Sequence, residues 1–180
     1  KEFRRRWQAA AVPRVLTIAG SDPSGGAGIQ ADLKSIAANG GYGMAAIAAL
    51  TVQNTRGVRA IHVPPVGFLR EQLDALSDDI VIDAVKIGML ADAEVVRTVL
   101  SWLDEVRPPV VVVDPVMVAT SGDRLLDTAA ESALRALLER ADVVTPNLAE
   151  LAVLVGREIA DWSDALAAAE ELSAQVGAAV

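Results

Sequence analysis

The chain has 180 residues, a formal net charge of −8 at pH 7 and no cysteine. Apolar residues make up 52% of it and aromatic residues only 3%, which is typical of one globular domain whose core consists of Ala, Val, Leu and Ile. These values exclude disulfides and thiolate metal sites within these residues, and they argue against nucleic acid or an anionic membrane as a partner.

The amino-terminal segment KEFRRR is basic, and only a short apolar patch at residues 9–12 separates it from Pro13. Because this patch is too short for the hydrophobic part of a secretory signal, we interpret residues 1–13 as a solvated leader or an expression remnant. No apolar run reaches the roughly 18–20 residues of a transmembrane helix. Residues 14–180 are predicted to form one domain of a cytoplasmic protein.

The most distinctive stretch is GSDPSGGAGIQAD at residues 20–32. It follows a β-branched apolar run at residues 15–19 and precedes helical apolar spacing, which predicts a strand, a glycine-rich turn and a helix. Three glycines, the last of them Gly28, allow the backbone to take positive φ angles and to approach a ligand without a Cβ in the way. Asp32 follows four residues later and is predicted to face back toward the loop, where it would accept from an amino or hydroxyl group of a ligand.

Three other interpretations of this turn were weighed. A P-loop needs a lysine directly after its last glycine, and the first lysine after Gly28 is Lys34, which excludes it. GAGIQA at residues 26–31 fits a relaxed dinucleotide fingerprint, but residues 46–56 lack the acidic residue that ribose recognition needs, so NAD is disfavoured. An ordinary βα turn, with Asp32 serving only the helix N-terminus, stays open.

The next segments predict a strand, a polar stretch and a second strand. The first helix is expected to end at residues 39–41, before a buried strand at residues 44–50. In the polar stretch 51–57, Gln53 offers a donor and an acceptor that suit the edge of a heterocycle, although a simple turn explains the stretch equally well. Residues 58–63 predict a short strand that carries His62, which we interpret as a surface residue.

The middle of the chain predicts helix, strand and helix in turn. Leucine spacing indicates a helix over residues 66–77, and residues 80–87 predict a strand that runs into KIGML. Met89 in this motif could line a pocket or fill the core, and we favour the interpretation as a core residue. The helix face formed by residues 95–103 then leads to the next strand.

VVVVD at residues 110–114 is typical of a buried central strand with an acid at its tip. Asp114 could there hold a metal-bound water or neutralise phosphate charge. The polar loop at residues 115–123 is predicted to form a lid over a site.

The last third predicts two helices around a strand at residues 142–145, the first of them over residues 128–140. Asn147 and Glu150 fit a capping box, and the same two residues could face a metal and phosphates. A final helix is expected to begin at Ser163 or Asp164 and to end at Gln175. Residues 178–180 look like the start of another strand.

Strand and helix alternate at least five times, which predicts an α/β fold. Its largely parallel central sheet would carry helices on both faces, with parallel strand–helix–strand connections throughout. The polar residues that follow the strands would share one crevice for a small polar ligand and a metal–phosphate group. These residues are Asp32, Gln53, Asp114, Asn147 and Glu150.

Five motifs, taken in order, carry a family resemblance. They are AGSDPSGGAGIQADLK at 19–34, VQNTRGV at 52–58, KIGML at 86–90, VDPVM at 113–117 and TPNLAE at 145–150. Over residues 14–180 the chain resembles the hydroxymethylpyrimidine/phosphomethylpyrimidine kinases of thiamine biosynthesis, which are members of the ribokinase-like superfamily. The resemblance implies phosphorylation of 4-amino-5-hydroxymethyl-2-methylpyrimidine, and then of its monophosphate, with ATP and Mg²⁺ as cofactors.

The resemblance also implies site residues. Those implied in substrate binding are Gly20, Gly28, Asp32, Gln53, Met89 and Val116. Asp114 and Glu150 are implied as magnesium ligands and Asn147 as a phosphate-binding residue. Within this picture Asp32 and Gln53 would hydrogen-bond the aminopyrimidine, and a homodimer is left open.

The family's Lys-Gly-Gly strand and Gly-Thr-Gly-Cys segment do not occur within these 180 residues. That segment supplies the anion hole and the supposed base, so we expect both beyond Val180 and expect these residues alone to turn over little. Two alternatives stay open. One is a pyridoxal kinase of the same superfamily, and the other is a non-catalytic pyrimidine-binding fragment.

Overall fold

The computed structural model describes residues 12–117 and 128–180, with the side chains of residues 128–131 excepted. The predicted leader and most of the predicted lid at residues 115–123 lie outside the described residues. The described strands are β1 (Arg14–Ser21), β2 (Tyr42–Asn54), β3 (Gly57–His62), β4 (Ala84–Ile87), β5 (Val111–Val113) and β6 (Val143–Val144). The described helices are α2 (Gly28–Ala38), α3 (Val66–Ser77), α4 (Ala93–Val106), α5 (Thr128–Leu138), α6 (Leu148–Val155) and α7 (Trp162–Val176).

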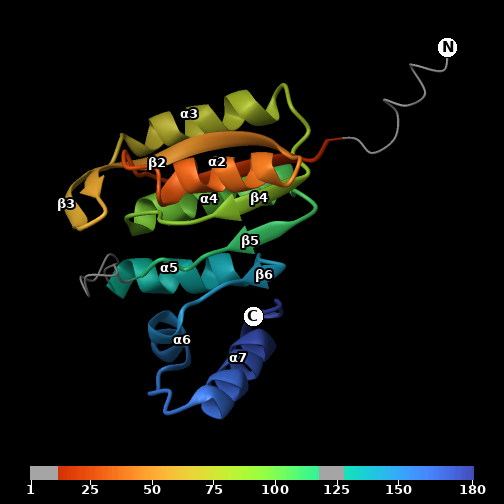
Figure 1. Ribbon diagram of the computed structural model, residues 1–180. Coiled ribbons are helices and arrows are strands. Elements are labelled where there is room, and N and C mark those ends of the chain that lie inside the picture. Colours follow the sequence, from red (N-terminus) through yellow and green to blue (C-terminus); the bar gives the residue numbers. More distant parts are fainter. Residues whose placement is uncertain (1–11, 118–127) are drawn as a thin grey trace.

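The strands form one six-stranded sheet in the order β3-β2-β1-β4-β5-β6 (Figure 1). Every neighbouring pair is parallel except β2 with β3. At the β6 edge, Ala179 forms a parallel bridge with Val143, in agreement with the strand expected to start near residue 178. The predicted α/β class with a largely parallel sheet is confirmed.

The antiparallel pair β2–β3 shows that the expectation of parallel connections throughout was wrong. β2 does not stop at residue 50 but continues through Gln53, which pairs with Val58. The strand then reverses in a tight turn, in which the side-chain oxygen of Asn54 accepts from the backbone N–H of Arg56 at 2.9 Å. The polar stretch is therefore the end of a strand followed by a turn between Asn54 and Gly57, in agreement with the interpretation of these residues as a turn.

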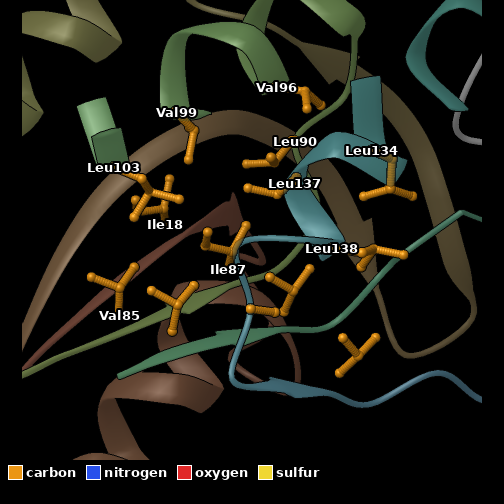
Figure 2. Close-up of a cluster of buried hydrophobic side chains, with 14 of the residues drawn as sticks. Ile18, Val85, Ile87, Leu90, Val96, Val99, Leu103, Leu134, Leu137 and Leu138 are labelled. Carbon is orange, nitrogen blue, oxygen red and sulfur yellow. The ribbon is translucent and has the colours of Figure 1, made fainter. Parts of the chain in front are cut away.

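Helices cover both faces of the sheet. On one face, Ile18, Val85 and Ile87 point toward apolar side chains of α4 and α5 (Figure 2). Thr17, the neighbour of Ile18, instead contacts Asp32 of α2, because successive strand residues face opposite sides of a sheet. Figure 1 shows α6 and α7 at the β6 end of the sheet.

The core is aliphatic except for one large aromatic side chain. Trp102 of α4 is completely buried, and its indole N–H donates to the hydroxyl of Ser77 in α3 at 3.3 Å. This contact ties the two helices together and satisfies the only polar atom of the indole.

The bounds of one helix agree with the prediction, whereas those of another helix and of one strand differ from it. α3 has the predicted bounds, but α7 is capped by Asp161, whose carboxylate accepts from the N–H of Asp164, and not by Ser163 or Asp164. The strand predicted over residues 80–87 is present only as β4. The residue just before it, Asp83, binds the backbone and guanidinium of Arg14 instead of extending that strand.

None of the described helices has both the length and the apolar character required to span a bilayer.

Candidate active site

The centre of the glycine-rich loop is Asp22, which sequence reasoning had overlooked. Its side chain is only 3% exposed, and its carboxylate accepts from the N–H groups of Ser24, Gly26 and Ala27 at 2.8–3.0 Å. The Ser24 hydroxyl, together with these N–H groups, holds the pKa of Asp22 below its ordinary value. The loop's donors are therefore occupied by the protein's own anion, which agrees with the exclusion of a P-loop. An acid placed just after a strand and before Pro-Ser-Gly-Gly was the available signal.

Two glycines of this loop are required by the backbone conformation itself. Only Gly25 and Gly28 of the three take positive φ, at 79° and 55°. A Cβ on Gly28 would lie 2.2 Å from the carbonyl oxygen of Gly20, so the close approach is between two backbone segments. Gly26 does not take positive φ, and its N–H donates to the carboxylate of Asp22.

Asp32 of α2 faces the sheet, contrary to the prediction that it faces the loop. Its Oδ2 accepts from the hydroxyl of buried Thr17 at 2.6 Å and from the ammonium of Lys86 at 3.1 Å. The helix lies along β1, so the second-turn side chain reaches the strand and not the preceding turn. Lys86 had not been singled out, although it begins the KIGML motif.

Lys86 also reaches a second carboxylate. Its ammonium lies 3.7 Å from Oδ2 of Asp114, which follows β5 and whose side chain is 36% exposed. Burial raises the pKa of Asp114, the positive charge of Lys86 opposes this rise, and the negative charge of Asp32 adds to it. Asp32, Lys86 and Asp114 thus form one charged cluster at the carboxyl ends of β4 and β5, beside Thr17 in the middle of β1.

Glu150 adds a third carboxylate near this cluster. It is 3% exposed, and burial raises its pKa, with a smaller contribution from the negative charge of Asp114. The predicted capping box is confirmed, since Glu150 Oε2 accepts from the N–H of Asn147 at 2.9 Å and Asn147 Oδ1 accepts from the N–H of Glu150 at 3.0 Å. Each side chain therefore has one polar atom in the cap, and the other is not used there.

Gln53 lines a pocket between the glycine-rich loop and the β2–β3 hairpin. The pocket has a volume of about 490 Å³, within the range of small-molecule sites. Its lining residues are Asp22, Ser24, Gly26, Ala27, Gln53, Asn54, Thr55, Arg56, Gly57 and Val58. Gln53 Oε1 lies 3.1 Å from the hydroxyl of Thr51. Asp32 is not among the lining residues of this pocket.

The two remaining residues predicted to bind substrate, Met89 and Val116, follow the carboxyl ends of β4 and β5. Met89 is half-buried and packs on the backbone of Gly20, with its sulfur 3.6 Å from the position of a Cβ there. It is not part of the hydrophobic core cluster, so its interpretation as a core residue was wrong. Val116 is half-buried, and its N–H donates to the carbonyl of Asp114. His62 is exposed, as expected.

A metal ion would find two suitable side chains here. Asp114 and Glu150 offer carboxylate oxygens, which Mg²⁺ prefers, and the negative charge of Asp114 contributes to the raised pKa of Glu150. Over residues 12–117 and 128–180, no group of three His, Cys, Asp or Glu residues is arranged to hold a metal. The donor set fits Mg²⁺, which commonly takes one or two carboxylates and completes its shell with water and substrate phosphates.

The parallel sheet, with its polar and charged residues gathered at the carboxyl ends of the strands, is that of a ribokinase-like small-molecule kinase. The family "Phosphomethylpyrimidine kinase" matches residues 22–180, and the chain belongs to this family.

Two curated relatives illustrate the similarity. The chain is 62% identical over 142 residues to the thiamine biosynthesis multifunctional protein ThiED of Corynebacterium glutamicum, a match that covers 79% of the chain and 19% of that protein. It is 50% identical over 141 residues to the hydroxymethylpyrimidine/phosphomethylpyrimidine kinase of Escherichia coli, covering 78% of the chain and 53% of the relative. The chain thus spans about half or less of these proteins.

Two solved kinase structures have a similar fold. The phosphomethylpyrimidine kinase of Clostridium difficile has a TM-score of 0.84 at 41% identity, over 91% of this chain and 71% of that one. A Staphylococcus aureus pyridoxal kinase, solved with AMP-PCP and pyridoxal, has a TM-score of 0.80 at 34% identity, over 94% of this chain and 61% of that one.

Proposed function

We propose that residues 14–180 belong to a kinase domain that uses Mg-ATP to phosphorylate 4-amino-5-hydroxymethyl-2-methylpyrimidine and then its monophosphate, for thiamine biosynthesis. The observation that carries this proposal is the cluster of Asp32, Lys86 and Asp114 at the carboxyl end of the sheet. In this cluster the carboxylate of Asp32 would be available to a polar ligand, and the neighbouring carboxylate of Asp114 would be available to a cation. Membership in the phosphomethylpyrimidine kinase family supports the choice of substrate.

The pyrimidine would be recognised by Asp32 and Gln53. Thr17 and Lys86 both bind Oδ2 of Asp32, and among the described residues Oδ1 has no hydrogen-bond partner. Oδ1 would accept from the exocyclic amine. The amide of Gln53 would donate to a ring nitrogen, since its oxygen lies against Thr51. Gly20, Gly28, Met89 and Val116 would shape the surrounding surface.

The phosphate side would use Asp114, Glu150 and Asn147. Asp114 and Glu150 would hold Mg²⁺, whose charge would offset that of the phosphoryl group being transferred. Asn147 uses its side-chain oxygen in the capping box, so its amide N–H₂ would be the group that binds phosphate. Glu150 would bind Mg²⁺ through one carboxylate oxygen, while its Oε2 accepts from the N–H of Asn147 in the capping box. The metal ligand would therefore be held in a fixed position at the start of α6.

Isothermal titration of the chain with the hydroxymethylpyrimidine and with pyridoxal tests the substrate assignment. We expect saturable binding of the pyrimidine and clearly weaker binding of pyridoxal, because Asp32 would accept from an exocyclic amine that pyridoxal lacks. Tighter binding of pyridoxal would favour a pyridoxal kinase, and binding of neither compound would contradict the proposal.

An ADP-release assay on the natural gene product, with its intact mass measured, tests catalysis. Pyrimidine-dependent release is expected from any product that contains the family's anion-hole segment, and the 180 residues alone should release little. A product that contains this segment and binds the pyrimidine, yet releases no ADP, would leave a pyrimidine-binding module as the better description.

A further inference from the structure

We propose that Lys86 is a positioning residue of the pyrimidine site, because it orients Asp32 so that one carboxylate oxygen accepts from the amino group of the substrate. The inference rests on the proposed function and deepens it. It assigns a specificity role to a residue that does not itself contact the amine.

The sheet places Lys86 where it can do this. β4 lies between β1 and β5, and Lys86 pairs in register with Thr17 on β1. Register partners on adjacent strands point to the same face, so both side chains rise toward α2, which carries Asp32. Three elements thus meet at one carboxylate.

Both contacts fall on the same oxygen. The Thr17 hydroxyl and the Lys86 ammonium bind Oδ2 of Asp32 at 2.6 and 3.1 Å. Two donors on one oxygen fix the rotation of the carboxylate plane and leave Oδ1 as a single, defined acceptor. A pre-oriented acceptor discriminates better than a mobile one, because it loses less on binding the correct donor.

The ammonium is also held in place from the other side. A Cβ on Gly88 would lie 3.0 Å from Lys86 Nζ, so the absence of a side chain there makes room for the cation. Asp114 lies 3.7 Å from the same nitrogen. Over the described residues, Lys86 is the only cation in ion-pair contact with Asp32 or Asp114. Without it, the two carboxylates would face each other unscreened.

The test compares two ligands and two lysine variants by isothermal titration. The ligands are 4-amino-5-hydroxymethyl-2-methylpyrimidine and the same compound without its 4-amino group. The variants are Lys86→Met and, as a matched control, Lys34→Met. Among the described residues, Lys34 donates only to the carbonyl of Gly25, so its removal takes one lysine from the same helix as Asp32 without removing a contact of Asp32.

The wild-type chain should bind the amino compound at least tenfold more tightly than the deamino compound. Lys86→Met should weaken binding of the amino compound about tenfold or more and bring the ratio of the two affinities close to one, whereas Lys34→Met should keep the wild-type ratio. An unchanged ratio in Lys86→Met would overturn the inference while leaving the function intact. An equal loss for both ligands would also overturn it, because Lys86 would then act on another part of the ligand.

A stability cycle provides a readout that needs no ligand. Lys86→Met, Asp32→Asn and their combination are compared by denaturant unfolding, with Lys86→Gln in place of Lys86→Met if the latter does not fold. Non-additive losses are expected for a pair in contact, and additive losses would overturn the inference. If the wild-type chain binds no pyrimidine but the cycle is non-additive, the proposed function fails and Lys86 is only a structural partner of Asp32.

Discussion

A Cβ atom on Gly28 would lie 2.2 Å from the carbonyl oxygen of Gly20, which is nearer than any such pair can approach. The first residue of α2 therefore touches the end of β1 backbone to backbone, and Ser21 forms a bridge to Gly28 at the same place. This contact fixes how α2 enters the fold, and with it the position of Asp32 one turn later.

Gly28→Ala should destabilise the chain by about 2–4 kcal/mol, since it combines a strained positive φ of 55° with a clash against backbone. Gly40→Ala is the matched control, because Gly40 also has a positive φ but no atom lies within 4 Å of its Cβ position. We expect this control to cost only about 1 kcal/mol. Equal losses of unfolding free energy for the two variants, measured by chemical denaturation, would show that Gly28 is not in close contact with Gly20.

Asp22→Asn should destabilise the chain most at neutral pH. Because the folded-state pKa of Asp22 lies below its ordinary value of 3.8, its ionised form stabilises the fold above about pH 4. That contribution is lost as the pH falls through the lowered pKa, so the gap between wild type and variant should narrow toward pH 3. Denaturant unfolding over this range measures the gap, with exposed Asp79→Asn as the control. A gap that stays constant would contradict the assigned role.

Trp102→Ala should cost about 3–5 kcal/mol, because it empties a fully buried site and removes the indole N–H that donates to the Ser77 hydroxyl. Trp162 provides the comparison, since its side chain is 72% exposed. Trp162→Ala should change the unfolding free energy by less than about 0.5 kcal/mol. Comparable losses for the two variants would indicate that α4 is not the centre of the core.

Gln53→Leu should weaken binding of the hydroxymethylpyrimidine by about 1–3 kcal/mol, the cost of leaving a buried polar partner unpaired, and should leave ATP affinity unchanged. Titration of both ligands measures the difference. Gln175→Leu, on the exposed face of α7, makes the same chemical change away from the site and should have no effect. An equal loss of affinity for both ligands would instead indicate that the substitution disrupts the β2–β3 hairpin.

Glu150→Gln should lower magnesium affinity without unfolding the start of α6. Glutamine at this position can still accept from the N–H of Asn147, so the capping box survives while the charge is lost. Thermal unfolding should therefore match the wild type, whereas a magnesium titration of the chain with ATP present should shift to higher concentration. An unchanged titration would refute the metal role.

Local signals determined much of this protein from the sequence alone. The bounds of α3, the capping box of Asn147 and Glu150, and the glycine stop of α7 at Gly177 all depend on residues within one or two helical turns. The order of strands and helices followed from apolar runs of the same short range. For these features the causes lie next to one another in the chain.

Tertiary structure decided what the site residues actually contact. Asp32 and Lys86 are 54 positions apart, and only the packing of α2 on β1 and β4 brings them together. The carboxylate of Asp22 accepts from N–H groups of its own loop, and β2 pairs with β3 as a hairpin. Which donors and acceptors pair in this way depends on the distances between them in the folded chain, and the sequence does not give these distances. Composition and spacing could therefore predict an α/β fold with carboxylates at one sheet edge, and the resemblance of five motifs to a known family implied a kinase. They could not show which carboxylate oxygen is left for the ligand, since that depends on which donors the fold brings to it.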